Sequence, residues 1–281
     1  MRRSAHRTHL AGLLALLAAG CGPAARSDAG APARRIVSLS PAITELLFAI
    51  GAGDRVVGRT TWCDYPAEAA RIPSVGDGLN PDLEAVVALH PDLVVLYRSP
   101  LNDAAARQLG SLGIATAVLP QDRLEDAARD ARLLGTLSGR PAAGDSVAAA
   151  IERLVAAPES SLGLSLAVVV WDNPPIVIGG ASYLDQLATL AGARNVFHDI
   201  AAASAVVSLE TLAVRDPDVI VVLADRGPGA LPAFAGRREW RAIRAVRARR
   251  FVVLVGSLFG RPSPRAGAAV AAFRRQLVAA R

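Results

Sequence analysis

Short apolar runs alternate along this chain with segments whose apolar residues recur at helical spacing. Two segments, 83–96 and 209–222, show this arrangement in the same form. In each, a Leu-Glu pair opens a short helix, a Pro-Asp dipeptide ends it, and a β-branched apolar run follows. Proline ends the helix because it has no backbone N–H and restricts the residue before it. The run that follows is typical of a strand buried on both faces.

A second, weaker internal similarity runs in the same order. The segment 36–56 resembles the segment 176–196 in its apolar pairs and in the helical stretch between them. Two similarities in one order predict two related α/β lobes, which is a duplication rather than a solenoid. Strands that alternate with helices predict a parallel sheet in each lobe.

The remaining elements follow from the same patterns. Ser40 and Pro41 are predicted to start the first helix. The serine side chain can accept a hydrogen bond from an unpaired backbone N–H, and proline at the first helical position has no N–H that would be left unpaired. Strands are expected at 36–39, 56–58, 93–96, 115–119, 166–170, 176–178, 219–222 and 251–255. Outside the repeat, helices are expected at 42–50, 103–112, 124–137, 183–190, 239–246 and 266–280, and loops at 60–66, 72–81, 171–175, 201–205 and 257–265.

Residues 141–158 are predicted to link the lobes. Their apolar residues have helical spacing, and a helix of about 15 residues would run roughly 22 Å. A single helical link predicts small opening and closing motions rather than wide hinge closure. The expected divisions are a signal segment at 1–20, a flexible tether at 21–33, a first lobe at 34–140, the linker helix at 141–158 and a second lobe at 159–281.

The N-terminal segment indicates export. Three arginines precede an apolar stretch at 10–19 that is too short to span a bilayer. The ending Leu-Ala-Ala-Gly-Cys at 17–21 resembles the lipobox of bacterial lipoproteins, in which Cys21 would carry lipid and anchor the protein to a membrane. The alternative is an ordinary secretory signal that ends near a cysteine. With Cys21 lipidated, Cys63 has no disulfide partner.

Composition narrows the function classes. Hydrophobic residues make up 52% of 281, enough for a sizeable core. All 31 basic residues are arginine, which excludes a P-loop lysine and a Schiff-base lysine. Without the three signal-segment arginines, 28 arginines face 25 acidic residues, a formal charge of +3. Nucleic acid is therefore not an expected partner.

Several motifs resemble periplasmic binding proteins for cobalamin, in the helix-linked class that feeds ABC importers. They are the opening 36–46, Asp-Tyr-Pro at 64–66, Asn-Pro-Asp-Leu-Glu at 80–84, Pro-Asp-Leu-Val at 91–94, Asn-Pro-Pro at 173–175 and Arg-Pro-Ser-Pro-Arg at 261–265. The resemblance implies two α/β lobes with a ligand cleft between them, a monomer, and a transported corrinoid rather than a cofactor. Siderophore- and haem-binding relatives share the fold, so a large iron chelate is the alternative ligand.

The resemblance also implies functional residues. In the family, one glutamate from each lobe pairs with arginines of the two permease subunits, and Glu84 and Glu210 occupy those positions. A glutamate in the first turn of a helix also interacts favourably with the helix dipole, which stabilises the helix by under about 1 kcal/mol. Glu84 and Glu210 can serve both as docking residues and in this structural role. The ligand contacts implied by the resemblance are Tyr65, Tyr97, Arg261 and the retained Phe259.

This chain departs from the family pattern in its aromatic residues. Gly-Asp-Gly at 76–78, Ser204, and Leu258 and Gly260 stand where family members carry rings or charge. Trp62 and Trp171 follow expected strands and are predicted to replace part of the missing aromatic cage, because ligands bind beyond the carboxyl ends of parallel strands.

Three other classes compete with this interpretation. A metal-ion receptor needs several His and carboxylate ligands, and beyond the signal segment only His90 and His198 remain, with Cys63 as a further candidate. A two-lobed enzyme would need a Gly-x-Gly-x-x-Gly turn or a Gly-x-Ser-x-Gly elbow, and neither is present. A lipid-anchored adhesion protein would not require matched glutamates on two lobes. We therefore expect a binding protein of an ABC importer that catalyses no reaction.

Overall fold

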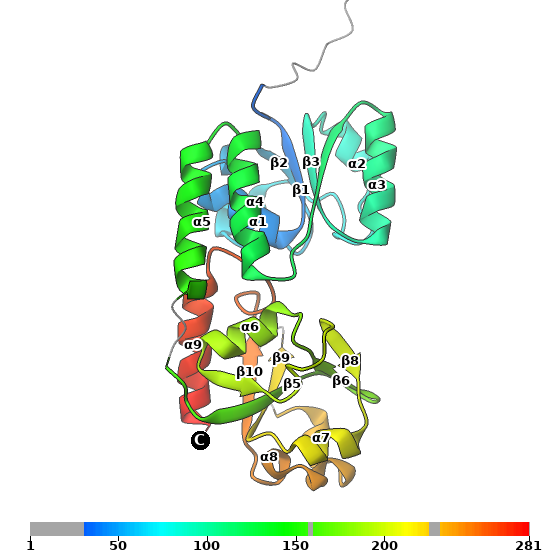
Figure 1. Ribbon diagram of the computed structural model, residues 1–281. Coiled ribbons are helices and arrows are strands. Elements are labelled where there is room, and N and C mark those ends of the chain that lie inside the picture. Colours follow the sequence, from blue (N-terminus) through cyan, green and yellow to red (C-terminus); the bar gives the residue numbers. More distant parts are fainter. Residues whose placement is uncertain (1–30, 157–159, 225–230, 281) are drawn as a thin grey trace, which may run out of the picture. The chain divides into compact units, whose positions relative to one another are not determined.

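The first lobe is built on a parallel sheet with the order β2-β1-β3-β4. A computed structural model describes residues 31–156, 160–224 and 231–280, and residues 32–281 form one compact unit. Alternate residues of the strands point to opposite faces, so α1 and α4 cover one face and α2 and α3 the other (Figure 1). The elements are β1 Ile36–Leu39, α1 Pro41–Ala49, β2 Val56–Arg59, α2 Leu83–Ala88, β3 Leu93–Tyr97, α3 Pro100–Ser111, β4 Ala115–Leu119 and α4 Leu124–Leu137.

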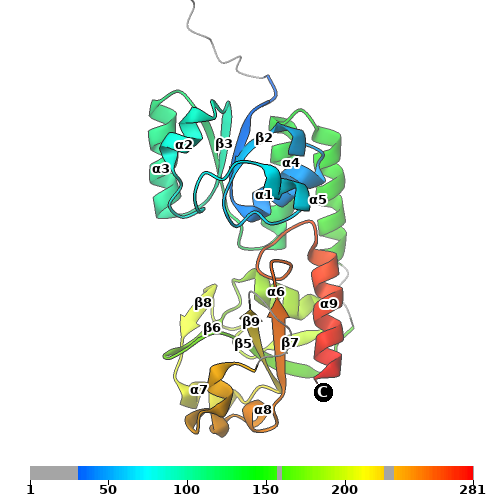
Figure 2. The ribbon, with the colours of Figure 1, turned by 180° about the vertical axis from the view of Figure 1, so that it is seen from behind.

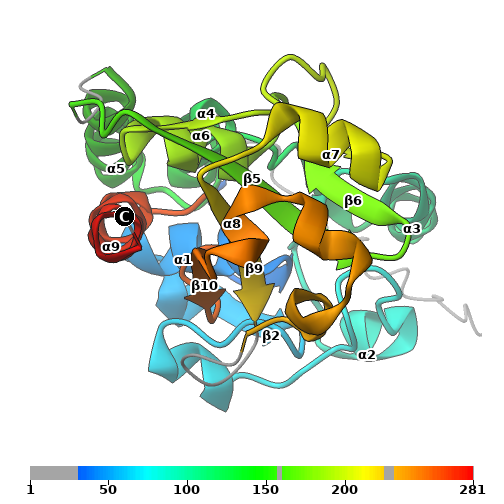
Figure 3. The same ribbon diagram turned by 90° about the horizontal axis from the view of Figure 1, so that it is seen from below.

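The second lobe has a mixed sheet with the order β10-β9-β5-β6-β8, and β7 also pairs with β5. Helices α6 and α9 cover one face, and α7 and α8 the other (Figure 3). The elements are β5 Leu164–Asp172, β6 Pro175–Ile178, α6 Tyr183–Leu190, β7 Ala193–Asn195, β8 Ser204–Val206, α7 Leu209–Arg215, β9 Val219–Ala224, α8 Arg244–Arg247, β10 Phe251–Val255 and α9 Ala266–Ala279. Short 3₁₀ turns lie at Gly53–Arg55, Ala67–Arg71, Ala233–Gly236 and Glu239–Ala242.

Three sequence-based expectations for the second lobe are wrong. The sheet is not wholly parallel, because β5 continues past 170 and turns back as β6, which is antiparallel to it. The expected loop 201–205 contributes β8, which pairs with β6. The expected helix 239–246 is broken at Ile243, whose backbone is extended and whose side chain is fully buried.

The principal repeat is confirmed in detail. Helix α2 leads into β3, and α7 leads into β9. The residues before the two prolines, His90 and Asp216, both have left-handed backbone angles, with φ of 45° and 35°. The aspartate after each proline accepts a hydrogen bond from a backbone N–H at, or just before, the start of the neighbouring strand. The Arg34 N–H donates to Asp92 at 2.8 Å, and the Ser165 N–H donates to Asp218 at 2.9 Å.

The weaker internal similarity is only partly structural. Helices α1 and α6 occur at matching places in the two segments. The strands that precede them differ, because β1 is parallel to both of its neighbours whereas β6 is antiparallel to both of its own. A sequence pattern fixes which face of a strand is apolar but not the direction of its partner.

Helix α5, Pro141–Ala156, lies against α4 as a wall of the first lobe and also meets α9 (Figures 1 and 2). Helices α4 and α5 approach closely at Gly144 of α5, where an added Cβ would lie 2.5 Å from the carbonyl oxygen of Ala131 in α4. One apolar cluster continues from α1 and α4 through α5 to α6 and α9. The lobes therefore share a packed core on the side of α5 and α9, and the domain boundaries given above stay a prediction.

Candidate functional site

A cleft with a volume of about 940 Å³ is lined from both lobes. Its walls are the segments that follow the carboxyl ends of β1, β2, β3, β4, β9 and β10, where ligands of parallel sheets bind. The lining residues are Ser40, Pro41, Ala42, Thr61, Trp62, Asp64, Tyr97, Gln121, Leu223, Ala224, Gly256, Ser257, Gly260, Arg261 and Pro262.

The cleft brings together three of the predicted ligand contacts. Trp62, Tyr97 and Arg261 all line it. Trp62 is 66% exposed although it is a large apolar side chain, so its ring is free to meet a ligand. Tyr97 ends β3 and is half-buried.

Tyr65 lies beside this wall but does not line the cleft. The Arg265 guanidinium stacks on the Tyr65 ring at 3.9 Å from its centre. A cation placed over an aromatic face stabilises by about 0.5–2 kcal/mol, depending on exposure. The structure therefore gives Tyr65 a partner from the second lobe.

Phe259 and Trp171 do not line the cleft, contrary to the sequence-based prediction. Phe259 is 4% exposed and packs in the apolar core shared by the lobes, because the loop after β10 folds inward there. Trp171 lies at the end of β5, where the turn into β6 carries it to a separate hollow of about 270 Å³. Its indole N–H donates to the Asn173 carbonyl at 2.9 Å.

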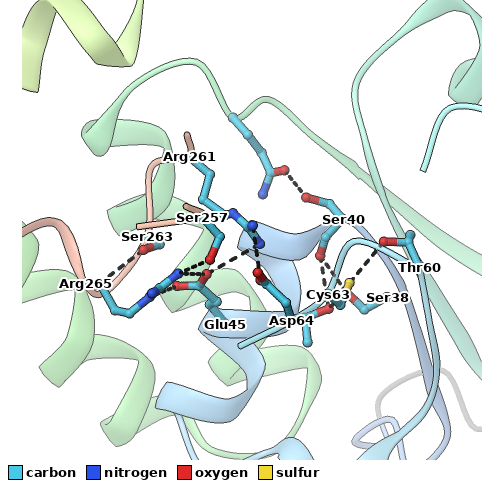
Figure 4. Close-up of polar contacts among 12 residues, drawn as sticks. Ser38, Ser40, Glu45, Thr60, Cys63, Asp64, Ser257, Arg261, Ser263 and Arg265 are labelled. Carbon is cyan, nitrogen blue, oxygen red and sulfur yellow. Dashed lines mark hydrogen bonds and ion pairs between the residues drawn. The ribbon is translucent and has the colours of Figure 1, made fainter. Parts of the chain in front are cut away.

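A buried carboxylate that the sequence analysis did not single out lies behind the cleft wall (Figure 4). Glu45, in α1, is 2% exposed. Arg265 binds it through two nitrogens, at 2.7 and 2.5 Å. The Arg261 Nη1 lies 3.6 Å from the same carboxylate, and its Nη2 donates to Asp64 at 3.2 Å. In the sequence, Glu45 is a single acidic residue within the apolar run of α1. The same pattern is equally typical of a glutamate exposed on a helix surface.

The charges in this network stabilise one another. Burial opposes the charge of Arg265, but the hydrogen bonds and charge of Glu45 outweigh it and raise the pKa of Arg265. Tyr183, at the start of α6, is 4% exposed and its hydroxyl has no hydrogen-bond partner. Burial, and then the charge of Glu45, raise the pKa of Tyr183 well above its usual value. The phenol therefore stays neutral beside the ion pair.

Neutral polar groups complete the wall of the first lobe. Ser40 precedes α1 as predicted, but its hydroxyl does not cap the helix. It donates instead to the Gln121 side-chain oxygen at 2.5 Å, which ties the ends of β1 and β4 together at the cleft. Cys63 is 1% exposed, and its sulfur lies 3.1 Å from the hydroxyls of both Thr44 and Thr60. The thiol is a buried packing group rather than a lining residue.

The two predicted docking glutamates occupy equivalent places. Glu84 is the second residue of α2 and Glu210 the second residue of α7. The residue directly before each helix caps it, Asp82 for α2 and Ser208 for α7. Each of these side chains accepts a hydrogen bond from a backbone N–H in the first turn. Both glutamates are exposed. A hydrogen bond from Ser208 is the main cause that lowers the pKa of Glu210, so it is charged at neutral pH.

The candidate metal ligands do not converge. His90 lies in the exposed turn before Pro91, and the Nδ1 of His198 pairs with Asp185 at 2.8 Å. In the ranges that the structure describes, no three His, Cys, Asp or Glu side chains are placed to hold a metal ion.

Cys21, the predicted lipidation site, lies outside the described residues. Among the described helices, none is both long and apolar enough to cross a bilayer.

Known proteins resemble this chain in sequence and in fold. The family model for periplasmic binding proteins matches residues 36–257. The vitamin B12-binding protein of Salmonella typhimurium is 34% identical over 199 residues, which cover 69% of this chain and 74% of that protein. The periplasmic vitamin B12-binding protein BtuF of Vibrio cholerae has a TM-score of 0.69 at 25% identity, covering 89% of this chain and 98% of that one.

A heme-binding protein matches the fold with a somewhat higher TM-score. The periplasmic heme-binding protein RhuT from Roseiflexus sp. RS-1 has a TM-score of 0.74 at 25% identity, covering 88% of this chain and 98% of that one. These likenesses confirm the two-lobed α/β architecture predicted from the sequence.

Proposed function

The chain belongs to the periplasmic binding protein family, and from that premise we propose that it captures cobalamin or a related corrinoid and delivers it to the permease of an ABC importer. Proteins of this family bind a transported ligand and are not enzymes, so the ligand is cargo rather than a cofactor. The 34% identical relative is a vitamin B12-binding protein, which supports the corrinoid as first choice.

The observation that carries the ligand proposal is the charge balance of the cleft. Among the described lining residues, Arg261 is the one cation and Asp64 the one anion, and they pair with each other. The rest of the wall offers neutral groups such as Ser40, Gln121 and Ser257. A corrin ring carries neutral amide side chains, which such groups can bind by hydrogen bonds. Its apolar faces can rest on the rings of Trp62 and Tyr97.

A haem or ferric siderophore is the second candidate. The heme-binding structural relative favours it, as does Tyr97, because a phenolate can bind ferric iron. Haem carries two carboxylates, however, and the described lining residues offer them a single cation, Arg261, for which Asp64 competes. Bringing two carboxylates beside Asp64 would be unfavourable, so the corrinoid fits better.

Delivery is proposed to use Glu84 and Glu210. Their equivalent places on repeated, exposed helix starts support a paired contact with a two-fold partner, such as two permease subunits that each present an arginine. An exposed ion pair adds only about 0–1 kcal/mol. The pair would therefore set register and association rate more than affinity.

Cys21 is proposed to carry the lipid that holds the exported protein at a membrane.

The test is a titration of the compact unit, residues 32–281, with cyanocobalamin, followed by heat and by tryptophan fluorescence. We expect one-to-one binding with a submicromolar Kd and quenching of Trp62. Losing the Trp62 ring should weaken binding about tenfold, or about 1.4 kcal/mol. Trp171→Ala is the matched control, because Trp171 is 59% exposed but lies outside the cleft. Binding of haemin and not of cyanocobalamin would replace the corrinoid with the second candidate.

A further inference from the structure

The loop between β10 and α9, residues 256–265, carries two arginines from the second lobe to one carboxylate of the first. Arg265 and Arg261 approach Glu45 from different sides (Figure 4). Glu45 does not line the cleft, so any effect it has on a ligand must act through other residues.

Arg265 is held firmly by groups of the first lobe. Its two nitrogens bind Glu45 at 2.7 and 2.5 Å, and its flat face covers the Tyr65 ring at 3.9 Å. A carboxylate that is almost fully buried is costly unless it is paired in this way. A planar fork of two hydrogen bonds also fixes the direction of the guanidinium. Arg265 therefore ties the loop to α1.

Arg261 is held more loosely, and it does line the cleft. Its Nη1 is buried without a hydrogen-bond partner, 3.6 Å from Glu45, so Glu45 attracts it by charge alone. Its Nη2 donates to Asp64, whose side chain is 58% exposed. A hydrogen bond to an exposed carboxylate exchanges readily with other acceptors, because water competes for that carboxylate.

We propose that Glu45 is a positioning residue for the ligand: through Arg265 it anchors the 256–265 loop to the first lobe, and through its charge it holds Arg261 at the cleft wall, where Arg261 exchanges Asp64 for an acceptor group of the ligand. The inference rests on the proposed function in one respect, namely that the ligand occupies this cleft. The amide oxygens of a corrin ring are acceptors of the required kind.

The first arm of the test is a double-mutant cycle on the Kd for cyanocobalamin, using residues 32–281. Glu45→Gln should weaken binding about tenfold, and clearly less when Arg261→Gln is already present, because the part of the effect that passes through Arg261 is then lost. Asp64→Asn should tighten binding, because it removes the competitor for Arg261. Arg237→Gln is the matched control, since Arg237 belongs to the second lobe and pairs with Asp172.

The second arm measures the distance between the lobes without ligand. Spin labels are attached to cysteines introduced at Leu101 in α3 and Val214 in α7, which are 57% and 85% exposed. The distance distribution should be narrow in the otherwise unchanged protein and in Asp64→Asn, and broader in Glu45→Gln. If Glu45→Gln does not fold, the double variant Glu45→Met with Arg265→Met removes both buried charges together and should also broaden the distribution.

Two results would overturn the inference. One is an equal loss of affinity from Glu45→Gln in both backgrounds. The other is an unchanged distance distribution in Glu45→Gln. If cyanocobalamin does not bind but haemin does, the corrinoid proposal fails. The double-mutant cycle is then measured on the Kd for haemin, and the same criteria decide the role of Glu45. If neither binds, the distance arm alone decides whether Glu45 anchors the loop.

Discussion

Asp130, in the middle of α4, makes the stability of this protein depend on pH. Its side chain is 1% exposed, and neither carboxylate oxygen has a hydrogen-bond partner. Burial raises the pKa of Asp130 from 3.8 to about 7, although the positive charge of Arg129 works against the shift. We predict that Asp130→Asn stabilises the protein at neutral and alkaline pH and has little such effect near pH 4.

The sign follows from the two pKa values. The folded protein keeps the Asp130 carboxyl protonated up to about pH 7, whereas the unfolded chain loses that proton above about 3.8. The free energy of unfolding should therefore fall as the pH rises between these values and level off above 7. At 1.36 kcal/mol for each pH unit the limit is about 4 kcal/mol. Relaxation and partial hydration reduce it, so we expect about 2–4 kcal/mol.

The assay is urea denaturation of residues 32–281 at pH 4.5, 6, 7 and 8. The advantage of Asp130→Asn over the parent should grow by up to about 3 kcal/mol between pH 4.5 and 8, with little of the increase above pH 7. Asp122→Asn, an exposed aspartate nearby, is the control and should follow the parent at every pH. Parallel stability curves for Asp130→Asn and the parent would refute the reasoning, because a carboxyl that is ionised in both states cannot produce this slope.

Two further predictions concern the surfaces of the lobes. Glu84→Arg combined with Glu210→Arg should lower uptake of cyanocobalamin by cells at least tenfold, with a Kd within twofold of the parent, because both residues lie outside the cleft. Reversal of Glu68 and Glu239, which are also exposed, is the control, and normal uptake by the docking variant would contradict the proposal. Tyr65→Ala should lower the free energy of unfolding by about 0.5–2 kcal/mol in thermal denaturation, whereas Tyr65→Phe, which keeps a ring under Arg265, should cost less.

The parts of the fold that were predictable have strong local signals. Helices α4 and α6 run over the residues predicted for them, 124–137 and 183–190, because each combines an apolar stripe with a clear start. The Pro-Asp dipeptides marked the ends of α2 and α7 correctly. Strands β7 and β8 have three residues each, too few for any periodicity to show.

The candidate site was predictable only where chain position decides it. Trp62 and Tyr97 follow or end strands, so the rule for parallel sheets places them at the cleft. Trp171 broke the same rule, because β5 turns into an antiparallel strand there. Glu45 and Arg265 are 220 residues apart in the chain. Nothing local distinguishes a glutamate that will be buried against a distant arginine from one on a helix surface.

The ion pair between α1 and the 256–265 loop has a consequence for the kinetics of import. If the lobes are fastened before a ligand arrives, the empty and loaded proteins present Glu84 and Glu210 at nearly the same spacing. A permease that recognises this spacing would then accept both forms, and the empty protein would act as a competitive inhibitor of delivery. Overproducing the binding protein when its ligand is scarce would then slow transport instead of raising it.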